Sequence, residues 1–324
     1  MHHLPTMDKI LTIGSLVYDD FDGIFFSYQS LRLNNQDILP ALDLVVVDNN
    51  PHSAEGKATK DFCNSASIRY EECTDGRSTS LRNRIFESAE APYVVCMDPH
   101  VLFEPQTIKL LAAFYQSNPE TKDLIQGPLI VDRVVGHDPM THMDPVWRDH
   151  MWGVWGLDPR GAKPDMPAFE IPMQGLGCFS AKKDEWLGFN DKFIGFGGEE
   201  GYIHEKYRQA ERTTWCLPFF RWLHRFPRPR GVPYPLRLEH RIHNYFVGFQ
   251  ELGLDIQPII DHFKEVSPGS DPEAVLRDLD NFREAFLVQQ GLTTNKNAPA
   301  MPMLSQQNNF QGAVDLNIPL KLPV

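Results

Sequence analysis

Apolar and polar positions alternate along the first 120 residues in a pattern that predicts strands separated by helices. Continuous apolar runs predict buried strands at 9–15, 43–48 and 93–97, with a weaker strand at 68–70. Apolar residues at helical spacing predict helices at 22–33, 78–90 and 105–117. Because continuous apolar strands that alternate with helices form parallel sheets buried on both faces, this half predicts an α/β fold with a mostly parallel central sheet.

The second half of the chain has a less regular pattern. Residues 127–175 are rich in Pro, Gly, Trp, Met and Asp, which predicts irregular strands and a long loop. After this region we expect a strand that returns to the sheet at 175–180, followed by helices at 199–211, 240–253 and 271–290. Residues from about 292 carry few charges and many Asn, Gln and Pro, which predicts a tail that is disordered or laid along the surface.

Polar clusters follow three of the predicted strands, at 15–20, 48–50 and 98–100. In open α/β sheets ligands bind outside the carboxyl ends of the strands, so clusters from three strands meet at one edge. The sequence therefore predicts a binding site assembled from separate loops at that edge.

The charge balance narrows the class of partner. The chain has 31 Lys+Arg against 43 Asp+Glu, a net charge of −12, which excludes general coating of nucleic acid or anionic membrane. Six arginines nevertheless gather within 221–243, where Glu239 is the one acidic residue. This distribution predicts a confined basic site, for which a diphosphate is a simpler partner than DNA.

The sequence also indicates a compartment. It has no apolar run long enough to span a membrane, and its start lacks the layout of a secretory signal. We therefore expect a cytoplasmic protein, in a bacterium or in the host cell of a virus. Widely spaced cysteines in such a chain are expected to be reduced and mostly buried; they are Cys63, Cys73, Cys96, Cys178 and Cys216.

Asp98-Pro99-His100 places a carboxylate and an imidazole two residues apart, just past a buried strand. Mixed oxygen and nitrogen ligands suit Mn²⁺ and similar ions. Together with Val-Val-Val-Asp-Asn-Asn at 45–50 and Ser-Leu-Arg-Asn-Arg at 80–84, this segment resembles the GT-A fold glycosyltransferases of the family 2 type. The motif at 98–100 is similar to the Asp-x-His metal motif of the polypeptide N-acetylgalactosaminyltransferases.

The resemblance continues into the second half and covers roughly residues 8–245. Gly-Phe-Gly-Gly-Glu-Glu at 195–200 resembles the Trp-Gly-Gly-Glu-Asp motif of the β-1,4-galactosyltransferases and the Trp-Gly-Gly-Glu-Asn motif of the former family. Leu-His-Arg-Phe at 223–226 and Pro-Tyr-Pro at 233–235 resemble the segment that carries that family's third metal ligand. One departure is that Phe196 stands near the place of the usual Trp, which leaves the stacking surface undefined.

The resemblance implies roles for particular residues. Asp98, His100 and His224 would hold Mn²⁺ or Mg²⁺ and so stabilise the charge of the leaving diphosphate. Nucleotide contacts would come from Asp48, at the base or ribose, and from Arg82 and Arg225, at the diphosphate. Catalysis would use Glu200 as the general base of an inverting transfer, while Glu199 binds acceptor hydroxyls.

Each of these residues also has a simpler interpretation. Glu199 and Glu200 fit a charged helix N-terminus, where carboxylates interact favourably with the helix dipole. His224 fits an ordinary core or surface histidine. The three tryptophans of the irregular region fit either a core or a platform for a sugar; they are Trp147, Trp152 and Trp155.

We therefore expect a GT-A domain at 1–245, with a nucleotide-binding half at about 8–125 and an acceptor-side half at 126–245. A helical extension at 246–291 and the tail at 292–324 follow. The expected function is metal-dependent transfer of a hexose from a nucleoside diphosphate sugar, most simply a UDP-sugar, to an acceptor hydroxyl. The acceptor stays open among glycan, protein, lipid-linked glycan and modified DNA base.

Two other classes compete with this interpretation. A sugar-nucleotide or carbohydrate-binding protein of the same fold would need no general base. A nucleotidyltransferase would carry a basic, Gly-rich loop after its first strand, whereas the loop here is acidic, with Asp19, Asp20 and Asp22.

Overall fold

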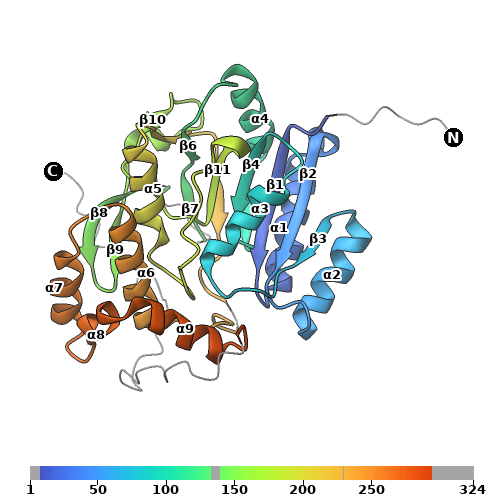
Figure 1. The fold of residues 1–324 in the computed structure, drawn as a ribbon. Coiled ribbons are helices and arrows are strands. Elements are labelled where there is room, and N and C mark those ends of the chain that lie inside the picture. The colour runs from blue at the N-terminus through green and yellow to red at the C-terminus, as the bar shows by residue number, and fades with distance from the viewer. Residues whose placement is uncertain (1–7, 133–138, 229, 294–324) are drawn as a thin grey trace.

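The computed structural model describes residues 8–132, 139–228 and 230–293 (Figure 1). Almost all of the tail predicted at 292–324 lies outside these described residues. All five cysteines are free and buried, as predicted. Within the described residues, each helix is too short or too polar to cross a membrane.

An eight-stranded mixed sheet forms the centre of the molecule, in the order β10-β12-β6-β11-β4-β1-β2-β3. Four of its seven pairings are parallel, which confirms the predicted mostly parallel α/β sheet. Its strands are β1 (Leu11–Val17), β2 (Leu42–Asp48), β3 (Arg69–Glu72), β4 (Tyr93–Met97), β6 (Leu124–Gln126), β10 (Phe169–Glu170), β11 (Cys178–Lys182) and β12 (Thr214–Cys216).

Two smaller sheets accompany it. One is three-stranded and joins segments far apart in sequence, with β5 (Val101–Phe103), β13 (Trp222–His224) and β7 (Leu129–Val131) in that order. The other is the hairpin of β8 (His142–Arg148) and β9 (Met151–Gly156), an irregular pair of strands of the kind predicted within 127–175. The first of these sheets matters for the site, because β5 begins directly after the segment 98–100.

Helices cover both faces of the central sheet. Side chains of α1, α2 and α4 share one hydrophobic cluster with alternate residues of β1 and β4, such as Ile13 and Val95. Side chains of α3 and α5 share a second cluster with the intervening residues, such as Val94. The helices are α1 (Phe21–Asn34), α2 (Ala54–Ala66), α3 (Asn83–Ser88), α4 (Thr107–Ser117) and α5 (Glu199–Gln209).

Four further helices follow along the chain and form a third hydrophobic cluster, at the lower left of Figure 1. They are α6 (Leu238–Glu251), α7 (Gln257–Val266), α8 (Pro272–Arg277) and α9 (Leu279–Gln289). Helix α6 runs across the expected domain boundary at 245–246, and that division stays a prediction. The single helix predicted at 271–290 is wrong in one respect, because Asp278 leaves helical geometry at φ −153° and its side chain caps α9.

Candidate active site

Three potential metal ligands meet where β4 and β13 end. Asp98 follows β4 directly, and its N–H donates to the carbonyl of Gly177 across the sheet. The antiparallel pairing of β5 with β13 sets His224 opposite Val101, beside His100. The ligand atoms of the Asp98, His100 and His224 side chains all lie within 4.8 Å of one another. The pairing of strands therefore brings together three side chains that span 126 positions of sequence.

The protonation states favour metal binding. Burial lowers the pKa of His100 to about 4, so its ring is neutral at pH 7. His100 Nδ1 lies 2.7 Å from Asp20 Oδ2, so the ring proton is held there. The lone pair of Nε2 then faces the cluster, 2.8 Å from Arg228 Nη2 and 3.1 Å from His224 Nε2. Burial opposes ionisation of Asp98, but the charge of Arg82 holds the pKa of that carboxyl well below its usual range.

These donors fit a divalent ion. They offer a carboxylate oxygen and two imidazole nitrogens, a set that suits Mn²⁺ and its neighbours. The carboxylate of Asp20 behind His100 is the arrangement that commonly orients a metal-binding imidazole. Asp20 is itself fixed, because its carboxylate caps α1 by accepting from the N–H of Gly23.

Arg82 links this cluster to the start of α5. Arg82 is 6% exposed, and its guanidinium lies 2.8 Å from Asp98 Oδ1 and 3.3 Å from Glu199 Oε1. It therefore fixes the carboxylates of two elements, a positioning role that was not predicted. The predicted contact of Arg82 with a diphosphate stays a prediction.

Replacing Arg82 with Met is expected to lower the free energy of unfolding by about 3–5 kcal/mol, because Asp98 and Glu199 would keep buried charge without a cation. Urea denaturation measures this loss. The control is Arg84→Met, since Arg84 pairs with Asp75 and Glu87 at the surface and should contribute about 1 kcal/mol or less. Equal losses in the two variants would contradict the positioning role of Arg82.

The Gly-rich motif shapes the turn before α5. Gly197 and Gly198 have φ values of +97° and +92°, which other residues rarely adopt. A Cβ on Gly197 would also lie 2.5 Å from Arg241 Nε. The buried side chain of Asn244 donates to the carbonyls of Ile194 and Gly197, which holds this turn against α6.

The two glutamates at the start of α5 differ in environment. Glu199 is 1% exposed and faces Arg82, which is at odds with its predicted contact with acceptor hydroxyls. Glu200 is half-buried and lines a cavity, and burial, then the charge of Glu199, raises its pKa to about 7. The helix N-terminus interpretation is correct for both, but for Glu200 it is compatible with a chemical role.

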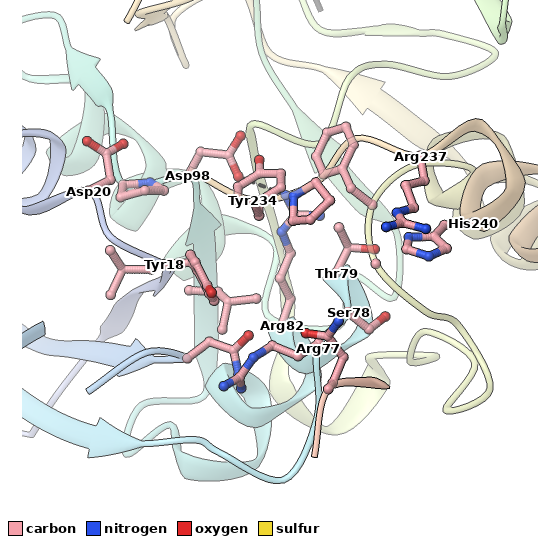
Figure 2. Close-up of a pocket in the computed structure, with 18 of the residues that line it drawn as sticks. Tyr18, Asp20, Arg77, Ser78, Thr79, Arg82, Asp98, Tyr234, Arg237 and His240 are labelled. Carbon is pink, nitrogen blue, oxygen red and sulfur yellow. Dashed lines mark hydrogen bonds and ion pairs between the residues drawn. The ribbon is translucent and has the colours of Figure 1, made fainter. Parts of the chain in front are cut away.

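Two cavities adjoin the metal cluster. The first cavity, of about 200 Å³, lies at the carboxyl ends of β1, β2 and β4 and is lined by Tyr18, Asn49, Arg77, Thr79, His100 and His240, among others (Figure 2). The second cavity, of about 640 Å³, is lined by Trp155, Gly175, Glu200, Trp222, His224 and Arg241, among others. Four side chains line both cavities: Asp98, Phe196, Arg228 and Tyr234. The metal cluster therefore stands between the two.

Two predicted nucleotide contacts lie elsewhere. Asp48 is buried and accepts hydrogen bonds from the Tyr70 hydroxyl and the Asn50 N–H, so its neighbour Asn49 faces the first cavity instead. Arg225 lies 3.0 Å from Asp20, outside both cavities. The arginine that reaches the cluster is Arg228, whose Nη2 lies 2.8 Å from His100 Nε2.

Sequence reasoning missed several cavity residues. Tyr18 packs edge-on to Tyr234, the Arg77 guanidinium lies 5.7 Å from the Tyr18 ring centre, and all three side chains line the first cavity. Of the tryptophans, Trp147 and Trp152 stack on each other among the C-terminal helices, as core residues do. Trp155 lines the second cavity, where the prediction of a sugar platform stays a prediction.

No protein-family model matches the chain, and no curated protein matches it significantly. Among solved structures, GalNAc-T7 with UDP, GalNAc and Mn²⁺ matches with a TM-score of 0.62 and 14% identity, over 88% of this chain and 55% of that chain. This chain thus spans about half the length of GalNAc-T7. The likeness confirms the predicted GT-A fold.

Two structures of S. aureus TarS 1-349, one with UDP-GlcNAc, match less closely. Their TM-scores are 0.48 and 0.47 at 13% and 12% identity. They cover 84% and 87% of this chain, and 74% and 79% of those chains. The first match alone therefore supports the assignment of the fold.

Proposed function

We propose that this protein is a metal-dependent glycosyltransferase that moves a sugar from a nucleoside diphosphate sugar to an acceptor hydroxyl, with inversion. The observation that carries the proposal is the cluster of Asp98, His100 and His224 between two cavities, one of which exposes Glu200. A donor in the first cavity would have its diphosphate at the cluster and its sugar toward the second. GalNAc-T7, which shares the fold, was crystallised with UDP, GalNAc and Mn²⁺, and this supports a UDP-sugar as the donor.

The chain's own groups account for the chemistry. Asp98, His100 and His224 would hold a divalent ion, which would supply Lewis-acid stabilisation to the leaving diphosphate. Arg228, which lines both cavities, adds positive charge at the same place, and we assign it the phosphate contact first predicted for Arg225.

Glu200 supplies the base. Its carboxylate takes the proton of the acceptor hydroxyl while the acceptor oxygen bonds to the anomeric carbon. The bond from that carbon to the β-phosphate oxygen breaks, and the electron pair leaves with the nucleoside diphosphate. Attack from the second cavity, on the side away from the diphosphate, inverts the configuration.

The raised pKa of Glu200 predicts a pH dependence. Only the ionised carboxylate accepts a proton, so kcat/KM should rise about tenfold per pH unit below pH 7 and level off above it. Initial rates between pH 5.5 and 8.5, at saturating Mn²⁺, measure the profile. A rate that is flat or falls between pH 6 and 8 would contradict Glu200 as the base.

A donor screen tests the function as a whole. The full chain is incubated with Mn²⁺ and a panel of UDP-, GDP-, TDP- and CMP-sugars, and release of the nucleotide is followed. We expect slow, EDTA-sensitive hydrolysis of one donor, with water in the place of the acceptor. If the folded protein released nucleotide from no donor, and donor binding by calorimetry were intact, a binding protein would be the better interpretation.

A further inference from the structure

One end of the first cavity contains polar side chains without partners. His240, on α6, is 3% exposed, and neither of its ring nitrogens has a hydrogen-bond partner among the described residues. Thr79 is 7% exposed, and its hydroxyl also has no partner there. Both residues line the first cavity, and Figure 2 shows them on the side away from Asp20 and Tyr18. Buried polar groups are nearly always paired, so this end of the cavity calls for a polar ligand.

A second histidine on α6 shows that a buried histidine of this helix need not lack hydrogen-bond partners. His243 lies one turn further along α6 and is 1% exposed. Its two ring nitrogens lie 3.2 Å from Asn244 Oδ1 and 3.3 Å from the Leu279 carbonyl oxygen. Both neighbours are oxygen acceptors and a neutral imidazole carries one N–H, so one of the two contacts is a hydrogen bond. The histidine that faces the core therefore has a partner, whereas the one that faces the cavity has none among the described residues.

The surroundings of His240 define the kind of ligand. Burial lowers its pKa to about 3, so at pH 7 the ring is neutral and offers one donor and one acceptor. The Thr79 hydroxyl offers both as well. Further along the same cavity the Tyr18 ring, with the Arg77 guanidinium 5.7 Å from its centre, adds an aromatic side chain to the lining. A planar ring with donors and acceptors along its edge is the chemistry of a nucleobase.

Size selects among the bases. The whole first cavity has a volume of about 200 Å³, below the roughly 300–1,000 Å³ usual for a ligand site. Because the ribose must share this space, a base with one ring fits it better than a base with two. Backbone also crowds this end, since a Cβ on Gly195 would lie 2.4 Å from His240 Nδ1. Phe286 and Gln289 of α9, and Gln290 directly after it, also line the cavity.

We infer that His240 and Thr79 bind the polar edge of a pyrimidine nucleoside and so select the nucleotide of the donor. This inference rests on the proposed function, because the diphosphate at the metal cluster directs the nucleoside into the first cavity. It assigns nucleotide selectivity in part to α6, a helix that follows the last metal ligand.

Calorimetry on the full chain with Mn²⁺ tests the inference. The ligands are UDP, CDP, ADP, GDP and pyrophosphate, and the variants are His240→Phe and Thr79→Val, with His243→Phe as the matched control. We expect wild type to bind UDP or CDP at least about tenfold more tightly than ADP or GDP, as a base that pairs all its polar groups should. Each cavity variant should lose about tenfold in pyrimidine affinity and none in pyrophosphate affinity, and the control should lose neither.

The outcomes separate the two proposals. Pyrimidine affinity unchanged in both cavity variants, or no base preference in wild type, would overturn the role of His240 and Thr79. Failure of wild type to bind pyrophosphate with Mn²⁺ would instead overturn the metal-diphosphate site. Binding of 2′-deoxy-UDP shows whether His240 contacts the base or the ribose. If His240→Phe weakens binding of both UDP and 2′-deoxy-UDP, the histidine contacts the base, as inferred. If it weakens binding of UDP alone, the histidine contacts the ribose 2′-hydroxyl and the inferred contact with the base is wrong. Thr79→Val, which conserves shape, keeps the test decisive if His240→Phe fails to fold.

Discussion

Replacing Glu200 with Gln is expected to lower the rate of sugar transfer about 10²–10⁴-fold, the usual contribution of a positioned general base. The amide keeps the size of the side chain and its place in the second cavity but cannot accept the proton of the acceptor hydroxyl. Affinity for Mn²⁺ and for the donor should stay within about twofold, since Glu200 does not line the first cavity and lies outside the metal cluster. Single-turnover transfer and calorimetry with UDP measure the two effects separately.

The matched control is Glu205→Gln, on the same helix. Glu205 pairs with Arg208 and lines neither cavity, so its replacement should leave transfer unchanged. Removing charge from Glu200 also removes its repulsion with Glu199, so the variant should be at least as stable as wild type. Transfer by Glu200→Gln within about tenfold of wild type would refute the assignment of the base and with it the argument for inversion.

The strands of the first half were predicted well because their pattern is local. The run at 93–97 coincides with β4, and the run at 43–48 lies within β2, since central strands buried on both faces are continuously apolar. Helix α2 was not predicted, because Ala54–Ala66 is mostly polar and buries only a few small residues, among them Gly56 and Cys63. The return strand begins at Cys178 rather than 175, because Gly175 and Gly177 form cavity wall instead.

The prediction of the site was correct for residues that lie in a short motif. It was incomplete for residues that come together only through packing. Asp98 and His100 follow a strand, and their place at the sheet edge could be inferred. His224 came from a resemblance, because its strand β13 has three residues and pairs with segments about 90 and 120 positions away.

Contacts between distant side chains left no such signal. Nothing in the pattern shows that Asp20 supports His100 across 80 positions, or that Arg82 links Asp98 to Glu199. The arginines at 221–243 were assigned to the diphosphate as a group, but side-chain direction separates them. Arg225 turns to Asp20 outside the cavities, whereas Arg228 reaches His100.

The metal cluster carries the second large prediction. Replacing His100 or His224 with Ala is expected to weaken Mn²⁺ binding by more than about 100-fold, because each change removes one of three protein ligands. Donor hydrolysis should fall with it, since the diphosphate would lose its stabilising charge. Mn²⁺ titration followed by electron paramagnetic resonance measures the affinity, and Zn²⁺ and Fe²⁺ are tested beside it because two histidines and a carboxylate bind several such ions.

A graded series ties this loss to the geometry. Asp20→Asn keeps all three ligands but removes the carboxylate behind His100, so it should cost only about 10–100-fold in affinity. His142→Ala, outside both cavities, should cost nothing. The free energy of unfolding, measured with and without Mn²⁺, gives an independent ranking of the affinities. With Mn²⁺ at 100 times the wild-type Kd, the ion should stabilise the wild type by about 2.7 kcal/mol, Asp20→Asn by less, and the His100 and His224 variants by almost nothing. Equal stabilisation of all these variants would place the ion elsewhere, because only a site formed by Asp98, His100 and His224 requires this ranking.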